Sequence, residues 1–186
     1  MPEKGGQGMA ISNDADPSPA LLIRDMYLAD LDDVLVIERH SFPTPWSRQS
    51  FLSELVDNTF AVYLVLEFCG RVAAYGGMWL ILDEAHVTNV AVLPEFRGHG
   101  FGEAMMEGLI ARAAERQAQR MTLEVARSNA VAQRLYAKLG FVQLGIRRGY
   151  YSNPVEDALI MWRDPLVPAP PEDGQGEGAP PAPGSA

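Results

Sequence analysis

Two segments of the sequence carry residues whose types and spacing could do chemistry. The first is Arg97–Glu103, in which Gly98, Gly100 and Gly102 alternate with other residues just before a stretch of helical apolar periodicity. Glycine permits backbone angles and close approaches that a Cβ would forbid. A glycine turn at a helix N-terminus presents unpaired N–H groups at the positive end of the helix dipole. The segment therefore predicts a phosphate or pyrophosphate site.

The spacing of these glycines excludes two common phosphate loops. A Walker A loop ends in Gly-Lys-Ser/Thr, whereas Gly102 is followed by Glu103 and Ala104. A dinucleotide-binding fingerprint needs G-x-G-x-x-G, whereas these glycines follow G-x-G-x-G. Two interpretations are left. The segment is either a phosphate-binding loop of the pattern Arg/Gln-x-x-Gly-x-Gly/Ala, beginning at Arg97, or a turn into a helix whose glycines only make the turn tight.

The second segment joins a strand glutamate to a helix tyrosine. In Met121–Val125, Leu123 and Val125 share one strand face and Glu124 lies on the other. A glutamate in a central strand is out of place for a core, and Tyr136 follows on the next helix, on the same side as Asn129. Taken singly, they could also be a partly exposed strand residue and a packed tyrosine.

The elements that position these segments follow from periodicity and turn residues. We expect strands at 21–24, 60–68, 71–82, 83–92, 121–125, 141–148 and 158–162. In the strand at 83–92, we expect His86, Thr88, Val90 and Val92 to alternate with Val87, Asn89 and Ala91. We expect helices from Leu31, from Ser47 to about Val56, after Gly102, and from about Asn129.

Turn and cap residues set how these elements connect. Asp30, Ser47 and Ser128 are candidate N-caps, and Gly140 is a candidate C-cap. A short turn at Cys69-Gly70 makes its two strands antiparallel, whereas the strand at 121–125 follows a helix and should be parallel to the strand at 83–92. The fold class is α/β: a mixed, mostly antiparallel sheet with helices on both faces.

Composition separates one domain from two polar ends. Of 186 residues, 47% are hydrophobic and 21% are charged, which is ordinary for a globular protein. Residues 1–19 and 165–186 are rich in Gly, Pro, Ala and acidic residues, and we expect both to be disordered. The domain is therefore predicted at 20–164.

Charge and cysteine usage exclude several function classes. The net charge is −9, and the two ends hold most of it, so the domain is mildly acidic and has no basic stripe for nucleic acid. Cys69 is the only cysteine, which excludes an internal disulfide and favours the cytoplasm. No apolar stretch has membrane-spanning length. His86 and His99 lack partners in the sequence for a metal site, and the oligomeric state is left open.

Five ordered segments together resemble the GNAT N-acetyltransferase superfamily, and within it the RimI-like branch, bacterial enzymes that act on the N-terminal alanine of small-subunit ribosomal protein 18. The resemblance covers about residues 21–161 and implies the GNAT fold. The segments are Phe42–Ser47, Asp83–Val92, Arg97–Gly102, Leu123–Phe141 and Arg148–Met161.

The resemblance implies acetyl-CoA as cosubstrate, no metal, Glu124 as general base and Tyr136 as general acid. It also implies an acceptor groove. The residues expected to bind acetyl-CoA are Val90, Ala91, Val92, Arg97, Gly98, His99, Gly100, Phe101, Gly102, Glu103 and Asn129. Those expected to bind the acceptor are Trp46, Tyr150 and Tyr151.

The implied acceptor is a protein N-terminus, most simply that of the ribosomal protein. With a pKa of about 7.7–8.0, an α-amine is roughly 10–15% neutral at pH 7, against roughly 0.04% for lysine. Two alternatives stay open: the same fold acting on lysine side chains, polyamines or other small amines, and a coenzyme A-binding module that senses acetyl-CoA without turnover. A sensor would need neither Glu124 nor Tyr136.

Overall fold

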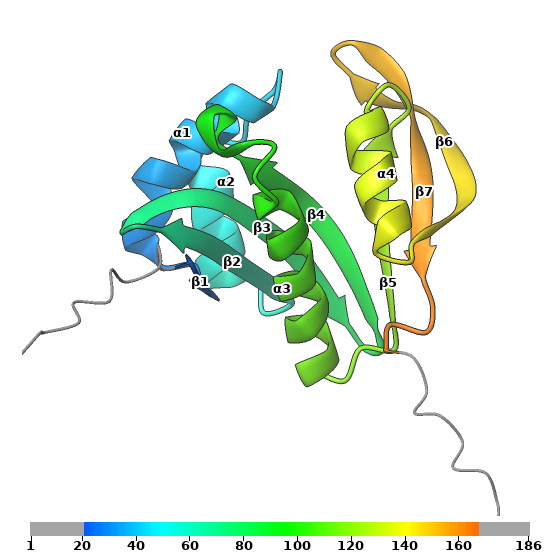
Figure 1. Ribbon diagram of the computed structural model, residues 1–186, viewed down its shortest axis with the longest axis horizontal. Coiled ribbons are helices and arrows are strands. Elements are labelled where there is room, and N and C mark those ends of the chain that lie inside the picture. Colours follow the sequence, from blue (N-terminus) through cyan, green and yellow to red (C-terminus); the bar gives the residue numbers. More distant parts are fainter. Residues whose placement is uncertain (1–20, 168–186) are drawn as a thin grey trace, which may run out of the picture.

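The computed structural model describes residues 21–167, which form a seven-stranded sheet (Figure 1). The predicted disordered end at 1–19 lies outside the described residues, as does 168–186. The order of the strands is β1-β2-β3-β4-β5-β7-β6. The strands are β1 (Leu21–Asp25), β2 (Ala61–Phe68), β3 (Arg71–Ile81), β4 (Glu84–Val92), β5 (Arg120–Ala126), β6 (Val142–Ser152) and β7 (Val155–Arg163).

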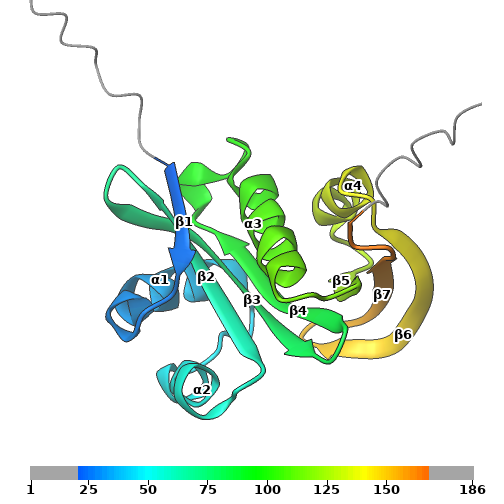
Figure 2. The same ribbon diagram turned by 90° about the horizontal axis from the view of Figure 1, so that it is seen from below.

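Four α-helices cover the two faces of this sheet (Figure 2). Helices α1 (Leu31–Ser41) and α2 (Arg48–Leu52) lie on one face, and α3 (Phe101–Glu115) and α4 (Ala130–Lys138) lie on the other. Every neighbouring strand pair is antiparallel except β4–β5, which is parallel. The predicted mixed, mostly antiparallel sheet with helices on both faces is confirmed. Within the described part of the chain, none of the helices has the length and apolar character needed to cross a bilayer.

Each face of the sheet has its own apolar core. The core under α3 contains Met105, Leu109 and Leu123, and the core under α1 and α2 contains Ile37 and Phe51. Burial of these side chains is the main favourable contribution to folding. The α3 core also includes Leu166, which is fully buried. The packed part of the chain therefore extends two residues beyond the predicted boundary at 164.

Ser47 and Asp30 have different roles at the ends of the first two helices. The Ser47 hydroxyl accepts the Ser50 N–H at 3.1 Å, so this predicted cap is confirmed. Asp30 makes no side-chain cap on α1, and that prediction was wrong. Its carboxylate instead accepts the Tyr27 N–H at 2.7 Å and a guanidinium N–H of Arg24 at 2.8 Å, so it closes the turn before the helix.

A β-bulge interrupts β4 at the point where the strand reaches the middle of the sheet. Gly77 of β3 pairs with Asn89, whereas the next residue, Met78, pairs with Val87, so Thr88 is the extra residue. Side-chain alternation changes phase there: Val87 faces the α3 core, yet so does Val90. The strict alternation expected from His86 to Val92 was therefore wrong. Bulges re-aim side chains and are frequent next to active sites.

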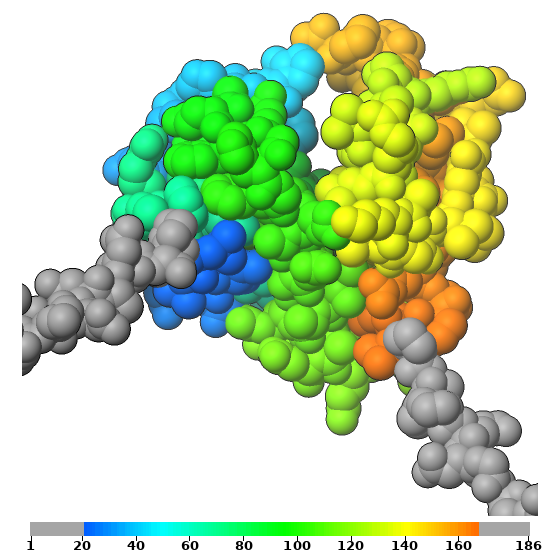
Figure 3. All heavy atoms as spheres, viewed as in Figure 1, coloured from blue at the N-terminus to red at the C-terminus, as the bar shows by residue number. Residues whose placement is uncertain are grey.

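Strands β4 and β5 separate at the same level. Their parallel pairing runs only from Glu84–Arg120 to Val87–Leu123. Beyond it, the rest of β4 stays paired with β3 but has no strand partner on its other edge among the described residues. Figure 1 shows β4 and β5 diverging, and Figure 3 shows the surface hollowed between the part of the molecule that contains α3 and the part that contains α4.

The C-terminal hairpin is longer than the sequence predicted. Strand β6 continues to Ser152 rather than ending at 148, and β7 begins at Val155 rather than 158. The register jumps between the pairs Arg147–Ala158 and Tyr151–Glu156, so three residues of β6 face one of β7. The bulge interrupts the alternation of side chains, so the sequence does not show that the strand continues past residue 148. The predicted turn at 150–154 is confined to Asn153 and Pro154, and Tyr150 and Tyr151 belong to β6.

We expect Gly77→Ala to destabilise the fold, because a Cβ at Gly77 would lie 2.2 Å from the Tyr63 ring. Overpacking of this kind costs about 1–3 kcal/mol of unfolding free energy. Urea unfolding measures it, and Gly145→Ala is the control, since a Cβ there has its nearest contact at 3.4 Å. Equal stability of the two variants would contradict the expectation.

Candidate active site

The glycine loop ends at the N-terminus of α3 with its backbone open to the outside. Gly98 and Gly100 have φ of 79° and 83°, and a Cβ at either would meet no atom within 4 Å. Gly100 is the N-cap of α3, and its carbonyl accepts the first helical bond, from Ala104 at 3.0 Å. The three preceding N–H groups of the helix have no intrahelical partner. The loop therefore offers several donors and the helix dipole to an anion such as a diphosphate.

Side chains of the loop hold it in place. The Arg97 guanidinium donates to the Val92 carbonyl at 2.9 Å and to the Ser41 hydroxyl at 3.1 Å, so Arg97 ties the loop to the ends of β4 and α1. Phe101 is buried and stacks with Phe96 at 5.6 Å between ring centroids. These contacts leave the backbone as the anion-binding part of the loop.

The other predicted loop contacts lie on the same rim. His99 is exposed, and its Nδ1 is 3.0 Å from the Arg97 carbonyl. Glu103 forms an ion pair with Lys138 of α4 at 2.6 Å, across the opening between the two helices. The predicted contacts of Arg97, His99, Phe101, Gly102 and Glu103 with a cosubstrate stay predictions.

Glu124 lies at the point where β4 and β5 separate. It is the residue after Leu123, the last member of the parallel ladder, and its side chain is on the face away from Leu123 and Val125. The side chain is 9% exposed; its Oε2 is 2.7 Å from His86 Nε2, and its Oε1 accepts from Arg147 Nη1 at 3.0 Å. The interaction with His86, helped by Arg147, lowers the pKa of Glu124 although burial opposes it. Glu124 is therefore ionised at neutral pH.

Tyr136 of α4 lies on the other face of the sheet. It packs into the α3 core, with its ring 6.0 Å from that of Phe141. Burial raises the pKa of Tyr136 to about 12, so its hydroxyl keeps its proton at neutral pH. A carboxylate and a protonated phenol thus flank β5 from opposite faces. They can serve as proton acceptor and proton donor.

Tyr151 lies beside Glu124 and close enough to Tyr136 to be influenced by it. Its hydroxyl donates to the Glu124 carbonyl at 3.5 Å. Burial, together with the nearby Tyr150, Tyr136 and Glu124, raises the pKa of Tyr151 to about 12. Tyr150 is exposed and meets the Tyr151 ring edge-on at 5.1 Å. The two tyrosines predicted to bind the acceptor therefore lie on β6, where Tyr151 contacts Glu124 of β5 and Tyr150 packs against Tyr151.

Asn129 caps α4, a role that the sequence had suggested for Ser128. Asn129 Oδ1 accepts the Ala132 N–H at 3.1 Å, so the prediction for Ser128 was wrong. Ser128 instead donates its N–H and its hydroxyl to Glu156 of β7. The amide nitrogen of Asn129 has no partner among the described residues, and it is available at the start of the helix that carries Tyr136.

Trp46 lies on the loop between α1 and α2 and is fixed from the core. Its backbone N–H donates to Glu38 Oε1 at 2.9 Å, and the centroid of its ring is 5.5 Å from that of Phe51. Glu38 itself is fully buried and also accepts the Tyr75 hydroxyl. The loop is therefore anchored rather than free, and the role of Trp46 toward an acceptor stays a prediction.

His86 and Arg147 are site residues that the sequence did not reveal. The sequence alone indicates no function for His86, although it lies in a strand that is predicted to be parallel to the strand of Glu124. The signal was present, but only the register, which pairs His86 with Thr122, places it within reach of Glu124. His86 also meets Trp79 edge-on at 6.1 Å, and Trp79 Nε1 donates to Glu54 at 2.7 Å. Arg147 could not be placed near Glu124 from the sequence either, because the bulge in β6 shifts its pairing with β7.

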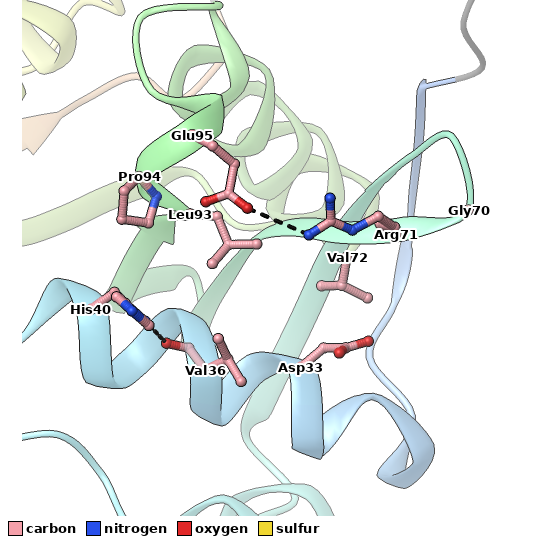
Figure 4. A pocket seen from close by; sticks show the side chains of 9 residues that line it. All are labelled: Asp33, Val36, His40, Gly70, Arg71, Val72, Leu93, Pro94 and Glu95. Carbon is pink, nitrogen blue, oxygen red and sulfur yellow. Dashed lines mark hydrogen bonds and ion pairs between the residues drawn. The ribbon is translucent and has the colours of Figure 1, made fainter.

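A separate hollow of about 280 Å³ lies on the α1 side of the molecule (Figure 4). It is lined by α1, the start of β3 and the segment after β4, and an Arg71–Glu95 ion pair of 3.4 Å spans it. None of the predicted site residues lines this hollow. Within residues 21–167, no group of three or more His, Cys, Asp or Glu side chains is arranged so that it could hold a metal ion.

Comparison with known proteins agrees with this architecture. Residues 31–141 match the model of the acetyltransferase (GNAT) family, and the chain belongs to that family. A Bacillus subtilis (strain 168) relative, named as a proposed ribosomal protein bS18-alanine N-acetyltransferase, is 46% identical over 140 residues, which cover 75% of this chain and 93% of the relative. The ribosomal protein bS18-alanine N-acetyltransferase of Escherichia coli (strain K12) is 36% identical over 141 residues, or 75% and 94% of the two chains.

A solved structure gives the same result in three dimensions. The crystal structure of the ribosomal-protein-S18-alanine N-acetyltransferase from Escherichia coli superimposes with a TM-score of 0.73 at 33% identity. The match covers 84% of this chain and all of the other. The predicted GNAT fold and the predicted family are therefore both confirmed.

We expect the stability difference between the wild type and Glu124→Gln to depend on pH. The folded pKa of Glu124 lies below its ordinary value, so the ionised carboxylate stabilises the fold fully above its unfolded pKa of about 4.3. That contribution is lost as the pH falls through the folded pKa. Urea unfolding at pH 7 and pH 3.5 should therefore show wild type losing more free energy than Glu124→Gln.

Glu115→Gln is the matched control, because Glu115 is 69% exposed in its pair with Arg112 and such surface pairs contribute little. A wild-type advantage over Glu124→Gln that is the same at both pH values would contradict the assignment of Glu124 as an ionised group.

Proposed function

We propose that the protein transfers the acetyl group of acetyl-CoA to the N-terminal α-amine of a protein, and that this acceptor is the N-terminal alanine of ribosomal protein bS18. The observation that carries the proposal is the ionised Glu124 at the separation of β4 and β5. The two curated relatives, which are named for this acceptor and match three quarters of the chain, support the choice of acceptor. A ribosomal acceptor also implies a cytoplasmic reaction.

Glu124 is the general base in this proposal. The acceptor amine must be neutral to attack the thioester carbonyl, and an α-amine is partly neutral at pH 7, whereas lysine is almost wholly charged. As the N–C bond forms, the amine nitrogen loses a proton, which Glu124 accepts directly or through one water. His86 and Arg147 support this role, because each contacts one carboxylate oxygen and together they hold the ionised group in place.

Tyr136 is the general acid. The C–S bond breaks as coenzyme A leaves as a thiolate, whose pKa is close to the 8.5 of an ordinary thiol. A donor at the sulfur lowers the cost of that charge, and the protonated Tyr136 hydroxyl can supply the proton. Both substrates are then bound together, with no acyl-enzyme intermediate.

The residues present fit acetyl-CoA. The open N–H groups of the Gly98–Glu103 loop suit the diphosphate, and the edge of Val90–Val92 that has no strand partner in the described sheet suits the pantetheine amides. The amide nitrogen of Asn129 is a donor at the start of α4. On the acceptor side, Tyr150 and Tyr151 form one wall beside Glu124, and the Trp46 loop is the proposed opposite wall.

The decisive experiment gives purified protein acetyl-CoA and two peptides, with mass spectrometry as the readout. One peptide has a free N-terminal alanine and no lysine, and the other is blocked at its N-terminus and has an internal lysine. We expect acetylation of the first alone, with loss of roughly 100-fold or more in Glu124→Gln and Tyr136→Phe. Modification of the blocked peptide alone would establish a lysine acceptor instead. Binding of acetyl-CoA without transfer to either peptide would favour a small amine or a sensor.

A second experiment tests the phosphate loop. We expect Gly100→Ala to weaken acetyl-CoA binding at least roughly tenfold in calorimetry, because a distorted loop misdirects its N–H groups. Gly70→Ala is the matched control: Gly70 also has positive φ (75°) and open space where a Cβ would lie, but it belongs to the β2–β3 turn. Both variants should lose about 1 kcal/mol of stability. Equal acetyl-CoA affinity in the two would exclude the loop as the diphosphate site.

A further inference from the structure

Arg147 reaches the proposed base from two strands away. It lies on β6, the edge strand, whereas Glu124 lies on β5, with β7 between them. Its register partner on β7 is Ala158, whose own partner on β5 is Ala126. Paired residues share a face, so two alanines lie under the path of the Arg147 side chain. The small side chains leave room for the guanidinium to cross β7 and donate to Glu124 Oε1 at 3.0 Å.

The β6 bulge brings two residues to Glu124 from one strand. Arg147 and Tyr151 flank the three extra residues, and both contact Glu124: Arg147 at the carboxylate, Tyr151 at the backbone carbonyl. The bulge is fixed by Asp157, whose Oδ1 accepts the Gly149 N–H at 2.9 Å, where Gly149 has a φ of 59°. The Arg147 guanidinium also lies 5.0 Å from the centroid of the Tyr150 ring.

A carboxylate held at one oxygen can still turn. The last side-chain torsion of glutamate adopts a broad range of values. A single hydrogen bond between His86 and Oε2 therefore leaves Oε1 free to rotate out of the site. A second bond, from Arg147 on the opposite side, removes that freedom. Each oxygen keeps a further lone pair for an amine or a water. The two-point hold therefore orients the carboxylate without blocking it.

We propose that Arg147 is a positioning residue of the acetyl-transfer reaction: from β6 it fixes the orientation of the Glu124 carboxylate. This rests on the proposed function of Glu124 as the general base. Arg147 itself touches neither reacting atom. Its 53% exposed side chain and its stacking on Tyr150 place it at the acceptor wall, so the base and that wall share one residue.

The charged and titratable groups around Glu124 come from three elements besides its own strand. His86 on β4 and Arg147 on β6 bind the carboxylate, Tyr151 on β6 binds the carbonyl, and Tyr136 on α4 is close enough to Tyr151 to influence it. Arg147 is the only guanidinium among them. Its removal is therefore expected to raise the pH at which Glu124 takes up a proton, with His86 still in place.

The test compares Arg147→Gln, Arg147→Lys and the neighbouring Arg148→Gln. The glutamine variant keeps a donor without the charge, and the lysine variant keeps the charge. Arg148→Gln makes the same charge change at an exposed residue with no described contact to Glu124. The first readout is kcat with the alanine peptide as acceptor, together with KM for acetyl-CoA. The second is the titration of the Glu124 carboxyl by 13C NMR, with its resonance assigned through Glu124→Gln.

We expect Arg147→Gln to lower kcat roughly tenfold or more, because a misplaced catalytic group loses that much, with KM for acetyl-CoA unchanged. Its Glu124 carboxyl should titrate at higher pH than in wild type. Arg147→Lys should recover part of both effects, and Arg148→Gln should match wild type in both. Arg147→Gln indistinguishable from Arg148→Gln would overturn the proposal, as would a loss of kcat with no change in the titration.

Failure of the proposed function would look different. If wild-type protein acetylates another amine but not the alanine peptide, the acceptor is wrong, and the same three variants are compared on that amine. If no amine is acetylated, the titration alone decides: unequal Glu124 titration in Arg147→Gln and Arg148→Gln retains the electrostatic hold, and equal titration overturns it.

Discussion

The separation of β4 from β5 is the constraint on which the rest of the site depends. A parallel ladder that continued past Val87 and Leu123 would close the sheet and leave no unpaired backbone between the two strands. The bulge at Thr88 instead changes which residues of β4 face each side of the sheet. Beyond Val87, the edge of β4 that faces away from β3 has no partner among the described strands. Unpaired backbone groups at a strand edge are a template for another extended chain. The sheet thus leaves backbone hydrogen-bonding groups of β4 without a strand partner at the edge proposed to bind the cosubstrate.

The groups around this opening divide between the two faces of the sheet. Tyr136 enters from the packed face, where burial keeps its hydroxyl protonated. Glu124 enters from the face that none of the described helices covers at β5, where partners can keep it ionised. Two environments thus hold two groups in opposite protonation states at one pH. The strand between them serves as the partition.

Much of this arrangement could be predicted from local sequence. Alternating apolar residues and the Cys69-Gly70 turn predicted the sheet, and the alternate glycines predicted the turn before α3, whose phosphate binding stays a prediction. Glu124 stood out because a carboxylate is unusual in a central strand. His86 and Arg147 could not be recognised, because they reach Glu124 only through strand register: His86 through the parallel pairing of β4 with β5, and Arg147 through pairing with β7 that the β6 bulge shifts. A bulge adds one or more residues without a distinctive sequence, so alternation predicts the strand but not its pairing.

Two adjacent carboxylates on β7 tie together parts of the site that are distant in sequence. Glu156 binds Ser128, directly before the helix that carries Tyr136, and Asp157 binds Gly149, within the bulge that carries Tyr150. Neighbouring residues of one strand thus anchor the start of α4 and the acceptor side of β6. These two walls form a single mechanical unit, since neither can shift without pulling on the same two residues. An acceptor bound beside Glu124, as proposed, would therefore meet one continuous surface rather than two independently moving segments.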